Sequence, residues 1–228
     1  MAQQERAIRT RHAILNAAAS VFDERGYEAA TIGEILTRAG VTKGALYFHF
    51  PSKQALAEGV LNAQFATMAL APRVCKLQEL VDVGLLTAYR MCTDPVVSAA
   101  ARLSLGQEMR TLFGSHAVAL WIEATKGMLA EAKAQGELLP QVDPAASAWI
   151  FSAAWTGVQV YSHTLSNRAD LTERIASLFE HLLPSIAVPA VLNGLVITAE
   201  RAAELHLESE ELARQAELEQ EEDVRAAG

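Results

Sequence analysis

The chain has 228 residues, of which 51% are hydrophobic and 20% are charged, and its formal net charge is −8. This length is sufficient for one or two domains with a buried core. No hydrophobic run approaches the roughly 18 to 20 residues that cross a bilayer, and the N-terminal segment has charges but no apolar signal-peptide core, so we expect a cytoplasmic protein without a membrane partner.

Acidic residues are concentrated at the C-terminal end of the chain. Residues 1–54 contain seven Lys or Arg and five Asp or Glu, which gives a net charge of +2. Residues 55–197 carry a net charge of −3, and residues 198–228 carry −7. Because the distribution of charge determines what each surface attracts, the first segment can bind a polyanion although the whole chain is acidic.

The first two predicted helices lie within residues 8–40. Apolar residues recur on one helical face from about residue 8, and Gly26 is the expected stop. Thr31 followed by Glu34 is a capping box, in which each residue satisfies a free backbone donor of the other. This box starts a short second helix that is expected to end at Gly40.

Two further helices are predicted directly after this turn. Thr42 is the expected N-cap of a third helix over about residues 42–48. Pro51 and Ser52 open a fourth helix, whose apolar positions continue to about Leu70.

The rest of the chain also has the periodicity of helices rather than the alternation of strands. Asp94 and Asp143 each precede a proline at a first helical position, and Asp170 with Glu173 forms another capping pattern. The expected helices cover residues 74–92, 95–105, 115–135, 143–165, 170–186 and 198–222. The sequence therefore predicts an all-α fold, with an N-terminal three-helix domain over residues 1–54 and a larger helical domain over residues 55–228 that ends in an acidic helix.

The two short helices separated by Gly40 are typical of a helix-turn-helix, in which the second helix enters the DNA major groove. Within this second helix, Leu46 and Phe50 are expected to be buried. Gly44 costs a helix about 1 kcal/mol relative to Ala, and a close approach to the DNA backbone would explain that cost. The residues expected to face DNA are Thr42, Lys43, Gly44 and Tyr47.

Several of these side chains suit contact with phosphates. Lys43 and Tyr47 can donate hydrogen bonds to phosphate oxygens, whereas the first turn of the helix would read bases. Arg6, Arg9 and Arg11, expected just ahead of the first helix, would add phosphate or minor-groove contacts. The alternative is an ordinary capped helical hairpin with a solvated basic terminus, which does not explain a surface Tyr47 near Lys43 and Gly44.

The stretch RTRHAILNAAASVFDERGYEAATIGEILTRAGVTKGALYFHFPSKQAL resembles the DNA-binding region of the TetR family of transcriptional regulators, across about residues 8–62. The continuation LAEGVLNAQ, together with Trp121 ahead of a GELLP loop, is similar to the actinobacterial gamma-butyrolactone autoregulator receptors. The features that match the TetR family are Gly26-Tyr27, Thr31, Ala39-Gly40-Val41, Gly44, Leu46-Tyr47, His49-Phe50 and Ser52-Lys53.

The resemblance implies a homodimeric repressor that binds a palindromic operator in double-stranded DNA. A small lactone or butenolide would bind the larger domain and release the DNA, with antibiotic production among the controlled processes. Together with the residue pattern, the resemblance assigns DNA contacts to Arg6, Arg9, Thr31, Thr42, Lys43, Gly44, Tyr47, His49 and Lys53.

A neutral lactone requires an apolar cavity with a few convergent hydrogen-bonding groups. Trp121 resembles the receptors' tryptophan that stacks on the ligand; the alternative is a core tryptophan. The Gln64 amide is a candidate to hold the lactone carbonyl, with a surface glutamine as the alternative. The other ligand-binding candidates are Trp155, Thr156, Gln159 and Tyr161, in a helix with more apolar residues than one buried stripe needs, which also predicts a dimer interface.

An enzyme is not expected, because the chain has no GxSxG, HExxH, P-loop or Rossmann glycine pattern and its six histidines include no i, i+4 pair. We therefore predict no catalytic residue, no metal site and no cofactor. The nearer alternative keeps the DNA-binding half and changes the effector, giving a TetR-type pseudo-receptor or a multidrug sensor that an antibiotic releases.

Overall fold

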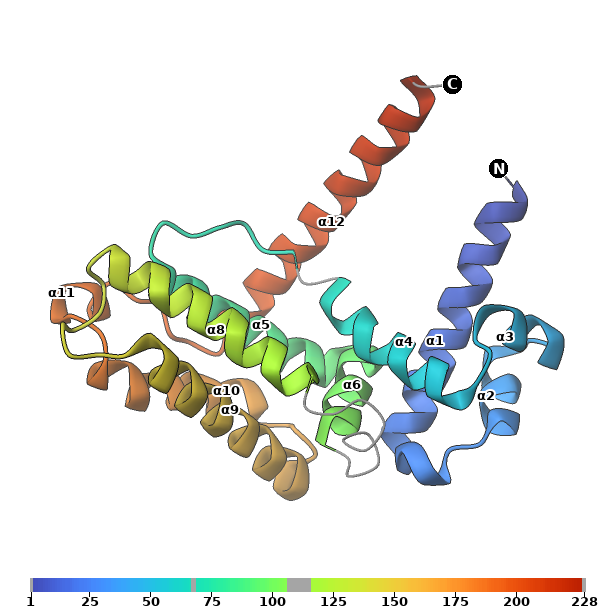
Figure 1. Ribbon diagram of the computed structural model, residues 1–228, viewed down its shortest axis with the longest axis horizontal. Helices are drawn as coiled ribbons and strands as arrows, with labels where there is room; N and C mark the ends of the chain where they lie inside the picture. The colour runs from blue at the N-terminus through green and yellow to red at the C-terminus, as the bar shows by residue number, and fades with distance from the viewer. Residues whose placement is uncertain (1, 67–68, 106–115, 227–228) are drawn as a thin grey trace. The chain divides into compact units, whose positions relative to one another are not determined.

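The structure is a computed structural model that describes residues 2–66, 69–105 and 116–226 (Figure 1). These residues form helices and one isolated antiparallel bridge between Leu138 and Ala187, which confirms the predicted all-α class.

The described chain divides into two compact units. Unit 1 includes residues 2–66 and 93–105, and unit 2 includes residues 69–92 and 118–226. The functional division at residue 54 stays a prediction, because compactness alone does not identify what each part binds.

Unit 1 is built around one hydrophobic core. Helix α1 contacts the other four helices of the unit, and α4 also packs on α6 (Figure 1). Buried side chains from different helices meet in this core, among them Phe22, Ile35, Leu46 and Leu103. The helices are α1 (Ala2–Ala29), α2 (Ile32–Ala39), α3 (Lys43–His49), α4 (Lys53–Ala66) and α6 (Pro95–Leu105).

Helix α1 begins earlier than the apolar periodicity predicted. It starts at Ala2, so Arg6, Arg9 and Arg11 lie within the helix and not ahead of it. The residues before the first apolar positions are mainly Ala, Gln, Glu and Arg, which have high helix propensity. The predicted stop is present, because Gly26 has φ of 77° and interrupts the helical backbone.

Helix α4 is shorter than predicted. Its described turns end at Ala66, and Leu70 is not helical. Pro72 explains part of this difference, since a proline has no backbone donor and disfavours helical backbone in the residue before it.

Unit 2 contains the remaining helices. Helix α9 packs along α10, and the ring centroids of Phe151 and Phe179 lie 6.2 Å apart across that contact. The elements are α5 (Lys76–Thr93), α8 (His116–Ala134), α9 (Pro144–Ser166), α10 (Leu171–Leu182), the 3-10 turn η1 (Leu183–Ser185), α11 (Pro189–Leu192) and α12 (Arg201–Ala226). Helix α11 lies in the segment that the sequence analysis left without a helix, and it has only one turn.

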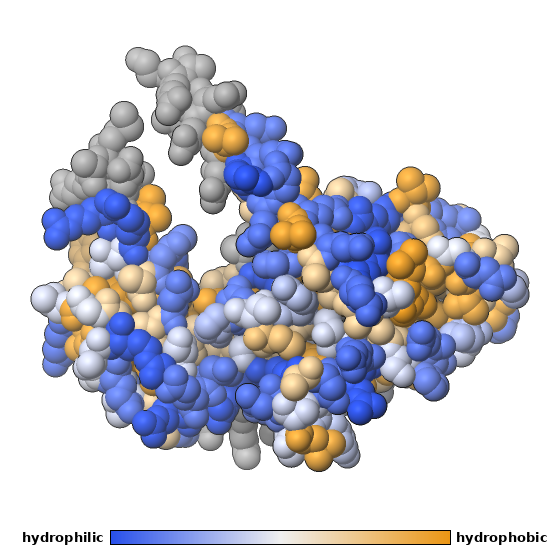
Figure 2. Space-filling view, turned by 180° about the vertical axis from the view of Figure 1, so that it is seen from behind, coloured by the Kyte–Doolittle hydropathy of each residue, from blue (hydrophilic) through white to orange (hydrophobic). Residues whose placement is uncertain are grey.

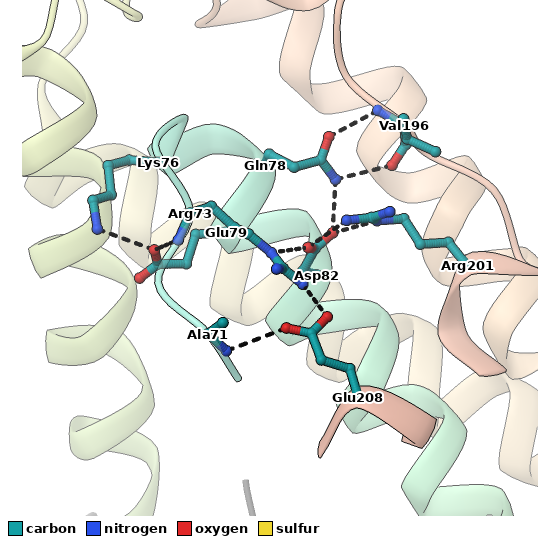
Figure 3. Close-up of polar contacts among 9 residues, drawn as sticks. All are labelled: Ala71, Arg73, Lys76, Gln78, Glu79, Asp82, Val196, Arg201 and Glu208. Atoms are coloured by element: carbon teal, nitrogen blue, oxygen red, sulfur yellow. Dashed lines mark hydrogen bonds and ion pairs between the residues drawn. The ribbon is translucent and has the colours of Figure 1, made fainter. Parts of the chain in front are cut away.

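A buried ion-pair network attaches the start of α12 to α5 (Figure 3). The Asp82 carboxylate is fully buried and accepts hydrogen bonds from Arg73 Nε at 2.8 Å and Arg201 Nε at 2.6 Å. Gln78 also donates to Asp82, and Arg73 pairs with Glu208 at 2.5 Å. We call these five residues the Asp82 network. The buried Asp82 charge thus has two opposite partners, Arg73 and Arg201, as burial of charge requires.

Beyond this attachment, α12 is mostly exposed. Figure 2 shows mainly hydrophilic residues along the helix, with isolated hydrophobic ones between them. Ala202 and Leu205 are buried near its start, whereas Leu207 and Leu218 are exposed. The first turns of α12, as far as the buried Ser209, therefore pack on the rest of unit 2, and the described side chains from Glu210 onward are exposed or half-buried.

Gly84 lets α5 approach the Phe179 ring closely. A Cβ added at Gly84 would lie 2.6 Å from Phe179 Cζ, which is closer than real Cβ contacts allow. Phe179 is buried and has little room to move. Glycine is therefore required here although it weakens a helix interior.

We predict that Gly84→Ala lowers the free energy of unfolding by about 1 to 3 kcal/mol, because the added methyl group overpacks a closed core. The matched control is Gly127→Ala in α8, where a Cβ would meet no atom within 4 Å. That change is expected to stabilise the protein by up to about 1 kcal/mol through helix propensity. Urea unfolding followed by circular dichroism measures both; equal effects of the two variants would contradict the packing explanation.

Candidate functional site

Hydrogen bonds at helix ends fix the turn between α2 and α3. The Thr31 hydroxyl accepts from the Glu34 N–H at 3.2 Å, and the Glu34 carboxylate accepts from the Thr31 N–H at 3.1 Å, so the predicted capping box is present. Gly40 ends α2 in the left-handed conformation with φ of 64°. The Thr42 hydroxyl then accepts from the Ala45 N–H at 3.3 Å and starts α3.

The same capping box changes the acidity of its carboxyl group. The Thr31 hydroxyl, followed by the Thr31 backbone N–H, donates to the Glu34 carboxylate and lowers its pKa. The carboxylate therefore stays ionised near the N-terminus of α2, where the helix dipole favours negative charge.

Helix α3 divides into a buried and an exposed face. Leu46 and Phe50 are buried in the core of unit 1 together with Ile35 and Phe22, as predicted. The opposite face is exposed and includes the residues predicted to face DNA. Its members are Thr42, Lys43, Gly44, Tyr47 and Phe48.

The exposed face carries a cation beside an aromatic ring. Lys43 Nζ lies 5.9 Å from the centroid of the Tyr47 ring, and Tyr47 is 40% exposed. Both side chains can donate hydrogen bonds to an anion from this position. Phe48 is 81% exposed, and the sequence analysis gave it no role. The sequence signal for its exposure is its spacing of four residues from Gly44, which places both residues on one side of the helix.

Packing within the chain does not require the glycine at position 44. A Cβ added there would meet no atom within 4 Å. The helix therefore accepts the propensity cost of glycine without an internal steric reason, which fits a close approach by an external molecule.

The other predicted DNA contacts are distributed around α3. Arg6 and Arg9 are exposed on α1. His49 is half-buried, and its ring makes an edge contact with Phe48 at a centroid distance of 5.0 Å. Direct contact of these residues with DNA stays a prediction.

Lys53 and Thr31 also have contacts inside the protein. Lys53 Nζ donates to the Glu28 carbonyl at 3.1 Å and lies 4.6 Å from the centroid of the Tyr27 ring. These contacts attach the start of α4 to the end of α1, just as the Thr31 hydroxyl is used to cap α2. Both residues have structural roles in addition to the predicted DNA contact.

In unit 2, the predicted ligand-binding residues of α9 differ in how deeply they are buried. Gln159 is buried, and Trp155 and Thr156 are half-buried. Tyr161 differs from them because it is 70% exposed. Trp149 and Leu165 are exposed on the same helix, so Tyr161 belongs with these outward-facing residues.

Helix α9 carries buried polar atoms that have no hydrogen-bond partner among the described residues. Among them are Trp155 Nε1 and Ser152 Oγ, from side chains one helical turn apart. Trp155 Nε1 lies 3.5 Å from the position of a Cβ on Gly84, so this part of α9 faces α5. The sequence analysis did not include Ser152, because a serine in a helix has no distinguishing pattern.

The remaining ligand candidates are on other helices. Trp121 is half-buried on α8. Gln64 belongs to α4, and its side chain lies outside the described part of the structure.

The described residues contain no group of three or more His, Cys, Asp or Glu side chains that could hold a metal ion. Within the same residues, no helix combines the length and hydrophobicity needed to span a bilayer.

Known proteins with similar sequences and folds are transcription regulators. Residues 14–60 match the family described as bacterial regulatory proteins, tetR family. The chain is 44% identical over 219 residues to the A-factor receptor protein of Streptomyces griseus. This alignment covers 94% of this chain and 79% of that protein.

Solved structures with the same fold extend this similarity to three dimensions. The crystal structure of TylP, a TetR regulator from Streptomyces fradiae, is 44% identical with a TM-score of 0.82, covering 90% of this chain and 99% of that chain. A gamma-butyrolactone receptor described as an ArpA-like protein is 28% identical with a TM-score of 0.69, covering 89% and 98%.

We predict that Gly44→Ala stabilises unit 1 by up to about 1 kcal/mol, because Ala has the higher helix propensity and its methyl group meets nothing within the chain. The same variant should bind DNA more weakly if the backbone at Gly44 approaches the duplex. Thermal unfolding and a DNA-binding titration measure the two effects. Unchanged DNA affinity would show that the glycine is not needed for close approach.

Proposed function

The chain belongs to the TetR family of bacterial regulatory proteins, and from this premise we propose that it is a homodimeric repressor, released from a palindromic operator by a small gamma-butyrolactone or butenolide. The proposed target genes include those of antibiotic production or other secondary metabolism. The observation that carries the proposal is the exposed face of α3, anchored on its other side by Leu46 and Phe50.

The DNA-binding half of the proposal uses the polar residues of that face. Lys43 and Tyr47 would donate to phosphate oxygens and set the register of the protein on the duplex. Thr42, at the first turn of α3, would approach base edges in the major groove. Arg6 and Arg9 on α1 would add contacts to phosphates.

Two observations support the ligand-binding half. The chain is similar to the A-factor receptor protein over most of its length. In addition, the unpartnered Trp155 Nε1 and Ser152 Oγ leave unmet hydrogen-bonding capacity inside unit 2, which costs about 1 to 3 kcal/mol for each such atom. A ligand oxygen that accepts from Trp155 Nε1 would offset this cost.

We assign the remaining ligand contacts by chemistry. Trp121 would stack on the apolar part of the ligand, and Thr156 and Gln159 would supply further polar contacts. A ligand contact by Gln64 of α4 stays a prediction. No catalytic role is proposed for any of these residues, and the relatives are regulators and not enzymes.

Dimerisation is proposed through the outward-facing residues of α9. Ile150, Tyr161 and Leu165 expose apolar surface on one side of that helix, and Gly157 between them has no neighbour within 4 Å of a Cβ position. Helix α10, which packs along α9, would complete a four-helix interface between two subunits. The two halves of a palindromic operator would hold recognition helices about 34 to 36 Å apart, and a dimer would supply one helix to each half.

The function is tested by isolating duplexes that the protein binds from a random library and then titrating effectors against the complex. Release by gamma-butyrolactones at lower concentrations than by antibiotics would support the receptor proposal. Release by antibiotics alone would identify a pseudo-receptor or multidrug sensor. The repressor proposal is wrong if the protein selects no duplex at all.

We predict that Trp121→Ala retains operator binding but needs roughly tenfold more lactone for release, because it loses apolar burial against the ligand worth about 1.5 kcal/mol. Trp121→Phe is the matched variant and should keep most of the response, since a phenyl ring can still stack. Fluorescence anisotropy of labelled operator gives both affinities. Normal release from the Ala variant would place Trp121 in the core alone.

We also predict that Tyr161→Asp converts the dimer to a monomer and weakens operator binding by more than tenfold, because a carboxylate would be desolvated in an apolar interface. Leu207→Asp on α12 is the control, since it introduces the same charge at another exposed apolar position. Sedimentation equilibrium measures the oligomeric state. A dimeric Tyr161→Asp variant would contradict the assignment of this face.

A further inference from the structure

Phe48 is the most exposed residue of the α3 face whose side chain has no hydrogen-bonding group. It is 81% exposed, whereas Leu46 and Phe50 already supply the buried anchors of this segment. Phe48 therefore does not stabilise the core of unit 1. It also cannot donate to a phosphate, which separates it from Lys43 and Tyr47.

The geometry of α3 leaves one side of the Phe48 ring accessible. Residues 44 and 48 lie one turn apart on the same helical face, and helical side chains lean toward the preceding turn. That turn carries Gly44, where no atom lies within 4 Å of a Cβ position. The Phe48 ring also contacts the His49 ring, with an interplanar angle of 83°. A small apolar group can therefore contact the ring next to Gly44.

We propose that Phe48 contacts the C5 methyl group of a thymine in each operator half-site and thereby contributes to sequence specificity. This inference rests on the proposed function, in which α3 enters the major groove. Among the groups that base pairs display in that groove, the thymine methyl is the apolar one, and the others are hydrogen-bond donors or acceptors. A phenyl ring on the exposed face of α3 is complementary to that group.

The test uses deoxyuridine, which differs from thymidine only by the missing methyl group. Each thymine of a selected operator is replaced in turn, in both half-sites, and binding of the full-length protein is measured. We expect one position at which the wild-type affinity falls by about fourfold for each half-site, as the loss of one buried methyl group predicts. Phe48→Ala should bind the thymine and uridine operators equally at that position.

Two control variants separate specificity from general affinity. Lys43→Ala should weaken binding to all operators while keeping the difference between thymine and uridine, because a phosphate contact does not depend on the base. Val74→Ala, at a residue of unit 2 that is 94% exposed, should leave both affinities unchanged.

Each outcome identifies which proposal fails. If the wild-type protein binds no duplex, the repressor proposal and this inference both fail. If it binds but is insensitive to uridine at every thymine, or if Phe48→Ala keeps the wild-type sensitivity, Phe48 does not read a methyl group and the repressor proposal stands.

Discussion

The burial of one side of α3 is the constraint on which the proposed DNA-binding surface depends. This helix has only seven residues, and an isolated helix of that length is not stable in water because nucleation is costly. Leu46 and Phe50 compensate by burial, each contributing about 1.5 to 3 kcal/mol. Gly40 and Thr42 fix where the helix begins. The exposed side chains are thus oriented by the core of unit 1 and not by the helix propensity of α3.

The local structure of this region could be predicted because its signals act over three or four residues. The pair Thr31 and Glu34 form reciprocal hydrogen bonds at a fixed spacing, and Gly40 adopts a backbone conformation that favours glycine. The start of α1 could not be placed in this way. Its first residues are polar helix formers without an apolar face, so hydrophobic periodicity gives no signal until the core is reached.

The sequence does not distinguish the buried residues of α9 from the exposed ones. The segment WIFSAAWTGVQV is apolar around most of the helix, so no single stripe indicates which side is covered. The burial of Gln159 and the exposure of Tyr161 follow from packing against other helices, which spacing does not encode. For a related reason, hydrophobicity gives no signal for the exposure of Phe48, because hydrophobicity alone assigns a phenylalanine to the interior.

The Asp82 network joins Arg73 to Glu208, which lie 135 residues apart in the chain. During translation, Asp82 therefore leaves the ribosome long before Arg201 and Glu208 are synthesised. Helix α6, the last described helix of unit 1, is complete by Leu105. Because domains tend to fold as units during synthesis, unit 1 can form while unit 2 still lacks α12. Synthesis thus places the two halves in temporal order, with the surface proposed to bind DNA assembled before the unit proposed to control it.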